Sequence, residues 1–350
     1  MSNSLLIVDL FSGAGGLSYG LTLAGFKTVS AVEHDKYAAA TYKKNHPSVK
    51  VFDTSIVNVT GNQLKNGYDA INGVIGSPPC QAFSTLGNRD LKDPRAWLFK
   101  EYIRILTELS PQFFVFENVK GLLSIDNGHH FDIILNLLND LGYTTSYALL
   151  NASEFGVPQH RKRVFVFGCK LGKLSFPSPT HGTIKSLLTV EDALSDMPNA
   201  VNNSTIIPYN TSPNNSLQAW YRSDSNGISQ HILPEHGNKL INLIKKIKQG
   251  QSIKNVKNHH VKSYFLNSYG RLLWNKPSPT ITRNLGSPSS ANCIHPIEHR
   301  GLTSREGARL QTFPDSFEFC GNKGSVNLQI GNAVPPILAM AIGNHLKNNL

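Results

Sequence analysis

The chain has 350 residues, of which 40% are hydrophobic and 16% charged, and this composition fits a globular protein with one sizeable domain and a smaller one. The formal net charge of +11 favours a polyanionic partner such as nucleic acid, although an ordinary basic composition gives the same count. The four cysteines show neither CxxC pairing nor histidines at zinc spacing, which argues against a disulfide framework or a metal site and for a reducing cytosol. We expect no signal peptide and no apolar stretch of bilayer-spanning length, hence no membrane association.

The first half of the sequence alternates strand-like and helix-like segments. In chain order, we expect strands at residues 5–10, 28–33, 70–76, 113–117 and 164–168. The helices expected between them lie at residues 17–24, 36–45, 97–109 and 131–141. Strands that alternate with helices in this way predict an α/β fold with a parallel, doubly wound sheet.

The composition and the pattern of the sequence change after about Phe176. Residues 177–262 are rich in Asn, Ser and Pro, and they show little alternation apart from one basic helix expected at 239–248. Regular order returns at Thr303 and Glu306, whose spacing is that of a capping box at a helix start. We therefore expect a second, irregular domain inserted before the C-terminal segment.

A glycine-rich turn, residues 9–17, follows the first expected strand and opens a helix. Glycines at such a turn let a ligand approach the backbone at the helix N-terminus. Glu33 ends the next expected strand, 20 residues after Gly13, where a ribose hydroxyl is typically bound. The pattern is not the GxGxxG of dinucleotide enzymes, so it indicates another adenosine-containing ligand. The alternative for Glu33 is a solvated carboxylate at a strand end.

Cys80 follows Pro78 and Pro79 at the end of an apolar run that predicts a buried strand. Proline fixes φ and removes a backbone donor, so the pair aims the thiol with little conformational freedom. A thiol aimed in this way suggests a nucleophile, whereas the alternative is a buried structural cysteine. Glu117 ends the next expected strand, and the two side chains are expected to face one substrate beyond the carboxyl ends of the strands.

Residues 159–163 read Gln-His-Arg-Lys-Arg and come directly before another expected strand. On a strand, Arg161 and Arg163 point to the same face, so two guanidinium groups could meet a phosphate or a base carbonyl. The alternative is a solvated basic edge strand.

Taken together and in this order, these segments closely resemble the DNA (cytosine-5)-methyltransferase family of the bacterial restriction-modification type. The matching runs are residues 9–17, Glu33, 76–84, 117–119, 159–163, 302–317 and 331–336. The resemblance implies a Rossmann-like sheet that uses S-adenosylmethionine, with a smaller irregular target-recognition domain. It places the catalytic and cofactor-binding domain at residues 1–176 and 318–350, the recognition domain at 177–300 and a connecting hinge at 301–317.

The resemblance also implies an activity: methyl transfer from S-adenosylmethionine to C5 of a specific cytosine in double-stranded DNA, with S-adenosylhomocysteine as product. The Cys80 thiolate would attack C6 of the cytosine and form a covalent adduct. Glu117 would hold or protonate N3, Arg163 would contact the base carbonyl and Arg161 would help to organise the adduct. The cytosine must leave the stacked duplex for this chemistry, so base flipping is expected.

Further residues are assigned by the same resemblance. The expected cofactor contacts are Phe11, Gly13, Leu17, Glu33, His34, Asp53, Pro79, Leu98, Asn332 and Val334. His34, and Thr54 after Asp53, depart from the usual family residues at the adenine pocket. The expected DNA contacts are Gln81, Ser84, Arg89 and Arg95 on a mobile catalytic loop, and Arg271 and Arg283 as candidate base readers. Phosphate contacts are expected from Lys254, Lys257, His259, His260 and Lys262.

Two alternatives to a DNA-modifying enzyme remain. The tRNA-methylating branch of the family carries a Cys-Phe-Thr signature, which this sequence lacks at Cys293 and at Cys320. A catalytically inactive DNA-binding regulator is disfavoured by the intact Cys80, Glu117 and Arg163. We expect a monomer in the bacterial cytoplasm, associated with the nucleoid through DNA, without a metal, and paired in function with a restriction endonuclease without a stable complex.

Overall fold

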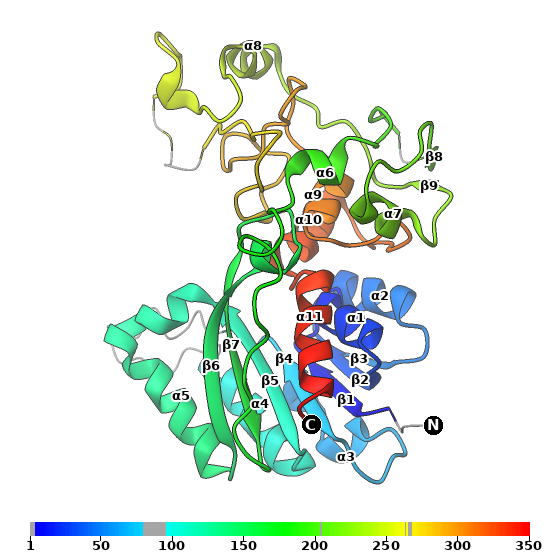
Figure 1. Cartoon of the computed structure of the whole chain (residues 1–350), viewed down its shortest axis with the longest axis vertical. Coiled ribbons are helices and arrows are strands. Elements are labelled where there is room, and N and C mark those ends of the chain that lie inside the picture. Colours follow the sequence, from blue (N-terminus) through cyan, green and yellow to red (C-terminus); the bar gives the residue numbers. More distant parts are fainter. Residues whose placement is uncertain (1–3, 80–95, 204, 263, 265–267) are drawn as a thin grey trace. The chain divides into compact units, whose positions relative to one another are not determined.

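A computed structural model gives the fold of residues 4–79, 96–203, 205–262, 264 and 268–350. The chain divides into two compact units (Figure 1). Unit 1 comprises Met1–Asn151, Lys162–Ser178 and Leu338–Leu350, and unit 2 comprises Ala152–Arg161 and Pro179–Ile337. The sequence predicted a functional division, into catalytic and recognition domains with boundaries at residues 176, 300 and 317. The two units describe which residues pack together, so that functional division stays a prediction.

Unit 1 is built on a seven-stranded sheet with the strand order β3-β2-β1-β4-β5-β7-β6. In chain order, the strands are β1 (Leu6–Leu10), β2 (Lys27–Glu33), β3 (Lys50–Asp53), β4 (Gly73–Gly76), β5 (Phe113–Val119), β6 (Thr144–Asn151) and β7 (Lys162–Cys169). The first five run parallel, whereas β7 pairs antiparallel with both β5 and β6. The α/β fold is confirmed, and the sheet is mixed rather than wholly parallel. The sequence missed β3 and β6.

Helices accompany these strands. They are α1 (Gly16–Leu23), α2 (Lys36–Asn45), α3 (Gly61–Leu64), α4 (Ala96–Leu109), α5 (His129–Asp140) and α11 (Pro336–Lys347), with the 3₁₀ segments η1 (Ile56–Asn58) and η4 (Lys120–Gly128). The run Phe113–Phe116 on β5 is completely buried, as expected for a central strand covered on both faces. Tyr102 on α4 packs edge-on against Phe114 and Phe116, because the apolar residues of α4 recur at helical spacing.

Unit 2 contains short elements joined by long irregular segments. They are η5 (Ala152–Phe155), α6 (Val190–Leu194), β8 (Ile207–Pro208), α7 (Ser216–Arg222), β9 (Gly227–Ile228), α8 (Asn238–Lys246), η6 (Ile253–Asn255), α9 (Ser304–Leu310) and α10 (Lys323–Asn332). The expected capping box is confirmed: the Thr303 side chain accepts the backbone N–H of Glu306 at the start of α9. Buried Arg309 on α9 donates to Asp315 and to Asp196, so these ion pairs link α9 to the segment that follows α6.

One stretch, Lys323–Lys347, is long and apolar enough to span a membrane. The expectation that no stretch of the chain has this length and composition is therefore wrong. However, 67% of its most apolar window is buried inside the protein, as in the core helix of a globular protein. The stretch is also divided into α10 and α11, because Ala333 adopts an extended backbone ahead of two prolines.

Candidate active site

The carboxyl ends of the parallel strands lie along one edge of the sheet. Glu33 at the end of β2 is in register with Asp53 on β3, and Leu10 at the end of β1 is in register with Gly76 on β4. Gly76 is in turn paired with Phe116, the residue before Glu117 on β5. Ligands of such sheets bind beyond these ends. The structure therefore brings the glycine-rich turn, Glu33 and Glu117 to one edge, as the sequence predicted.

The glycine-rich turn is held to β2 by the Glu33 carboxylate. Glu33 is buried, and its two oxygens accept the backbone N–H groups of Gly13 and Asp35, both at 2.8 Å. Gly13 has a φ of 56°, and a Cβ placed there would meet no atom within 4 Å. The turn thus presents an open, side-chain-free backbone in front of an ordered carboxylate. Such a site suits a ligand with hydroxyl or amino groups.

A buried polar cluster beneath this turn was not singled out from the sequence. Ser18 on α1 donates to the Asp9 carboxylate, and the Tyr42 hydroxyl on α2 donates to Ser18 Oγ at 2.7 Å. Burial raises the pKa of Asp9 to about 7, the hydrogen bond from Ser18 opposes this rise, and the nearby Glu33 charge adds to it. The cluster ties the end of β1 to the first two helices. Only the tertiary structure reveals this cluster, because the partners of Asp9 lie on helices further along the chain.

The other expected cofactor contacts occupy varied positions. Within unit 1, the His34 ring lies 3.2 Å from Glu33 Oε1, and this hydrogen bond raises the pKa of His34. Asp53 forms an exposed ion pair with Lys43 at 3.3 Å.

The remaining expected cofactor contacts differ in burial. In unit 1, Leu17 is buried, and Phe11, Pro79 and Leu98 are partly buried. In unit 2, Val334 is buried and Asn332 is exposed at the end of α10. Cofactor contact by each of these residues stays a prediction.

Glu117 and Arg163 form a nearly buried ion pair at this sheet edge. Arg163 Nε lies 3.1 Å from Glu117 Oε1, and the two side chains are 13% and 6% exposed. Glu117 on β5 is in register with Phe165 on β7, so Arg163 is its diagonal neighbour on the same face of the sheet. Burial lowers the pKa of Arg163, and the Glu117 charge opposes this effect. The two residues expected to contact the base thus lie side by side.

Asn118 connects this pair to the proline run. Its side-chain nitrogen donates to the carbonyl oxygen of Pro78 at 2.8 Å, in a buried hydrogen bond. Pro78 lies two residues before Cys80, so the chain is anchored next to Glu117 just ahead of the expected nucleophile. Cys80 itself lies outside the residues that the structure describes, together with four expected DNA contacts, Gln81, Ser84, Arg89 and Arg95. The sequence indicated the run containing Asn118 but not this link.

Arg161 does not share a ligand-facing surface with Arg163 in the manner expected from the sequence. It precedes β7, belongs to unit 2 and is completely buried. Its two terminal nitrogens donate to the carbonyl oxygens of Ile281 and Gly331, at 3.1 and 2.9 Å. The guanidinium thus joins segments of unit 2 that lie far apart in the sequence. Its expected part in organising the adduct stays a prediction.

The two candidate base readers differ sharply in their surroundings. Arg271 is 6% exposed, and its guanidinium donates to carbonyl oxygens of unit 2. These are the oxygens of Ile244, Ile247, His295, Pro296 and Glu298, at 2.6 to 3.4 Å. This is the environment of a structural residue, because few donor positions are left to meet a base. Arg283, in contrast, is exposed.

A group of potential metal ligands in unit 2 contains its own cation. Ligand atoms of His295, Glu298 and Glu306 lie within 4.8 Å of one another. The Arg300 guanidinium donates to both carboxylates at 2.7 to 2.9 Å. Burial alone would raise the pKa of Glu306, but the hydrogen bonds and charge of Arg300 lower it to about 2. A guanidinium therefore fills the position that a metal ion would need.

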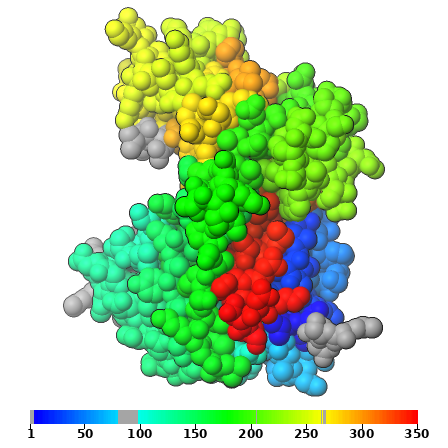
Figure 2. All heavy atoms as spheres, in the orientation of Figure 1, coloured from blue at the N-terminus to red at the C-terminus, as the bar shows by residue number. Residues whose placement is uncertain are grey.

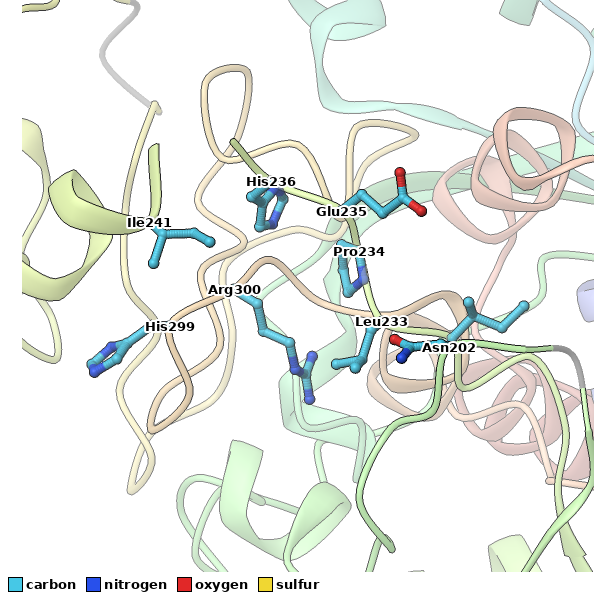
Figure 3. A pocket seen from close by; sticks show the side chains of 9 residues that line it. Asn202, Leu233, Pro234, Glu235, His236, Ile241, His299 and Arg300 are labelled. Atoms are coloured by element: carbon cyan, nitrogen blue, oxygen red, sulfur yellow. The ribbon is translucent and has the colours of Figure 1, made fainter. Parts of the chain in front are cut away.

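Arg300 also lines a cavity of about 300 Å³ in unit 2 (Figure 3). His236, His299 and Ile241 lie around the same cavity. The Arg300 donors are already engaged by Glu298, Glu306 and the Gly301 carbonyl oxygen, and His236 accepts the backbone N–H of Gly301. The polar groups of this cavity are thus largely used within the protein, which makes it a poor ligand site compared with the sheet edge.

Comparisons with known proteins agree with this geometry. The family model for C-5 cytosine-specific DNA methylases matches residues 5–348. The Type II methyltransferase M.DdeI of Desulfomicrobium norvegicum is 36% identical, over 97% of this chain and 88% of that protein. The Type II methyltransferase M1.HphI of Haemophilus parahaemolyticus is 35% identical, over 97% of this chain and 86% of that protein.

The solved structures give the same result. A structure described as a prophage-encoded DNA modification methyltransferase of E. coli superposes with a TM-score of 0.82, at 28% identity and with 99% of each chain covered. The Dnmt2 methyltransferase of S. pombe superposes with a TM-score of 0.61 at 17% identity, which shows a shared fold. The family match across nearly the whole chain, together with these relatives, identifies an enzyme of the Type II restriction-modification kind. The chain belongs to the C-5 cytosine-specific DNA methylase family.

Proposed function

We propose that this enzyme transfers a methyl group from S-adenosylmethionine to C5 of a cytosine within a specific duplex sequence, through a covalent adduct between Cys80 and C6 of a flipped base. One observation carries the proposal: Glu117 is paired with Arg163, and its neighbour Asn118 holds the proline run that leads to Cys80. A carboxylate, a guanidinium and the approach to a thiol thus converge at the edge of the sheet where ligands bind.

The chain's own residues account for the chemistry on the base. The Cys80 sulfur forms a bond to C6, and the ring electrons move toward C5. Glu117 meets the charge that develops at N3 by holding or donating a proton there. Arg163, whose Nε fixes one Glu117 oxygen, orients that carboxylate and directs positive charge at the base carbonyl. After methylation, loss of the C5 proton to a base expels the Cys80 thiolate and restores the aromatic ring.

The glycine-rich turn supplies the cofactor site in this proposal. S-adenosylmethionine, when bound, provides an electrophilic methyl group on a sulfonium. Gly13 leaves open space at the backbone, and the Glu33 carboxylate is held by two N–H groups beside it, so these residues fit the ribose of such a ligand. His34 and Asp53 lie at the same strand ends and would contact the adenosine. S-adenosylhomocysteine is the expected product.

A suicide-substrate experiment tests the covalent step. Wild-type enzyme is incubated with S-adenosylmethionine and duplex DNA that carries 5-fluorocytosine at the target, because fluorine at C5 prevents the elimination that would release Cys80. A complex stable to denaturing electrophoresis is expected. Cys80→Ala should abolish it, and Cys320→Ala is the matched control, since Cys320 is a partly buried cysteine outside any disulfide. Equal trapping by Cys80→Ala would show that another residue is the nucleophile.

The relatives named as Type II methyltransferases support a cellular role as the modification partner of a restriction endonuclease. We propose action as a monomer in the bacterial cytoplasm, with residues 177–300 carrying target recognition. Bisulfite sequencing of host DNA that has been exposed to the expressed enzyme identifies the methylated site. Methylation without any common sequence would contradict the modification role, and light scattering of the purified protein at working concentration tests the monomer.

A further inference from the structure

Among the described residues, three donors of the chain itself share the Glu33 carboxylate. Its Oε2 atom accepts the backbone N–H of Gly13, and its Oε1 atom accepts the backbone N–H of Asp35, both at 2.8 Å. The Nδ1 atom of His34 lies 3.2 Å from the same Oε1 atom. A carboxylate offers about four acceptor positions, two on each oxygen. With these donors in place, Oε1 is filled and Oε2 keeps one position for a further donor.

The three donors differ in how readily they can leave the carboxylate. The two backbone N–H groups are fixed, because Gly13 belongs to the glycine-rich turn and Asp35 caps α2. The Glu33 side chain is 8% exposed, whereas the His34 side chain is 78% exposed. His34 directly precedes α2, which reaches the surface of the molecule (blue in Figure 2). An exposed side chain changes its rotamer within nanoseconds, so His34 can leave Glu33 without any movement of the backbone.

A ribose requires more from this carboxylate than the remaining acceptor position supplies. Two neighbouring hydroxyl groups of a ribose are both donors, and a carboxylate that faces them can accept one on each oxygen. While His34 and Asp35 donate to Oε1, that oxygen has no position left for the second hydroxyl. His34 and the ribose therefore require the same atom of Glu33.

We propose that His34 competes with the ribose of S-adenosylmethionine for the Glu33 carboxylate and thereby sets the affinity of the enzyme for its cofactor. The inference rests on the proposed function, which makes this compound the ligand of the glycine-rich turn. His34 leaves Glu33 when the ribose binds, and its ring is then available to contact the adenosine. The competition is strongest when the imidazole is protonated, because a cationic donor binds a carboxylate more tightly than a neutral donor.

The charged groups around His34 favour its protonated form. The hydrogen bond to Glu33 raises the pKa of His34, partial burial opposes this rise, and the negative charges of Glu33 and Asp35 add to it. The neighbouring strand end carries another carboxylate, Asp53, which is paired with Lys43. The contact with Glu33 is therefore the main cause of the raised pKa.

The proton balance gives the sign of the effect on cofactor binding. In the free enzyme, the contact with Glu33 keeps the pKa of His34 above its ordinary value. When the ribose takes the place of the ring, this pKa falls back, so binding releases a proton wherever His34 was protonated. The affinity for the cofactor is therefore highest above the raised pKa of His34, and it declines as the pH falls through that value.

Isothermal titration calorimetry with S-adenosylhomocysteine tests this competition on the full chain, at about pH 6 and about pH 8 on either side of an ordinary histidine pKa. Wild type is compared with His34→Asn, in which a neutral amide can still donate to Glu33 at every pH. His129→Asn is the matched control, since His129 is an exposed histidine of unit 1 on α5. Asp9, whose pKa burial raises to about 7, is common to all three proteins, and its effect cancels in their ratios.

From pH 8 to pH 6, the Kd of wild type should rise about threefold more than the Kd of His34→Asn, as expected for the loss of an exposed charge pair. His129→Asn should behave as wild type. Equal pH dependence in wild type and His34→Asn would overturn the proposal.

A second measurement follows the His34 ring itself. The pKa of His34, determined by nuclear magnetic resonance on the wild-type chain, should fall when S-adenosylhomocysteine saturates the protein. A pKa that stays the same or rises on binding would also overturn the proposal. Failure of the proposed function is recognised separately, because S-adenosylhomocysteine would then bind the wild-type chain at neither pH.

Discussion

Replacing Asp9 by Asn tests the buried cluster beneath the glycine-rich turn. Asp9 is 1% exposed and accepts a hydrogen bond from Ser18, and burial raises its pKa from 3.8 to about 7. Asparagine has the same shape and can accept the same hydrogen bond from Ser18, but it cannot ionise. The substitution therefore removes the charge while it keeps the packing of β1 against α1 and α2.

The sign of the effect follows from proton binding. Between pH 4 and 7 the folded protein keeps the Asp9 proton, whereas the unfolded chain has lost it. The folded state binds more protons, so the Asp9 contribution to stability falls as the pH rises through this range and then stays constant. A shift of this size costs about 4 kcal/mol at pH 8, of which about 2.5 kcal/mol develops between pH 5 and pH 8. Asp9→Asn lacks this loss.

The assay is urea unfolding followed by far-ultraviolet circular dichroism at several pH values from 5 to 8, with wild type and variant measured side by side. His46 titrates in the opposite direction, because burial lowers its pKa to about 4 and its contribution to stability rises with pH toward 6.5. That contribution is common to both proteins and cancels in their difference. The free energy of unfolding of Asp9→Asn relative to wild type should thus increase by about 2.5 kcal/mol from pH 5 to pH 8.

Ser18→Ala is the matched control. It removes the hydrogen-bond donor but keeps the ionisable carboxyl group, so the decline of stability with pH should persist in this variant. A difference between Asp9→Asn and wild type that is the same at every pH would refute the reasoning. It would mean that Asp9 is already ionised at pH 5 in the folded protein, and that burial does not raise its pKa.

Two further predictions concern the arginines of unit 2. Arg271→Met should lower the free energy of unfolding, measured with urea, by about 3 kcal/mol or more, because buried carbonyl groups lose their donors. Arg222→Met removes a more exposed ion pair and should lower the free energy of unfolding by less. Equal losses in the two variants would contradict the structural role of Arg271. Arg283→Ala should relax sequence preference at one base position by about 1–3 kcal/mol, measured as methylation rates on duplexes with each base replaced in turn. A uniform loss of rate over all these duplexes would show that Arg283 contacts phosphate.

The sequence by itself determined which local segments form and what chemistry they bear. Apolar runs and helical spacing predicted most strands and helices of unit 1, because such patterns reflect the period of the element and the faces it buries. The proline run before Cys80, Glu117 and the glycine-rich turn were predicted to lie at strand ends. The described parts of these segments do so, since parallel strands bring their carboxyl ends to one edge of the sheet.

Only the tertiary structure decided what surrounds each charged side chain. Arg271 and Arg283 looked alike in the sequence, yet one is buried among carbonyl groups 24 to 27 residues away and the other is exposed. The hydrogen bond from Asn118 to Pro78 spans 40 residues, and the antiparallel pairing of β6 with β7 was not foreseen. The energy of a guanidinium or carboxylate depends on burial and on partners distant in the chain, and these are absent from local sequence patterns.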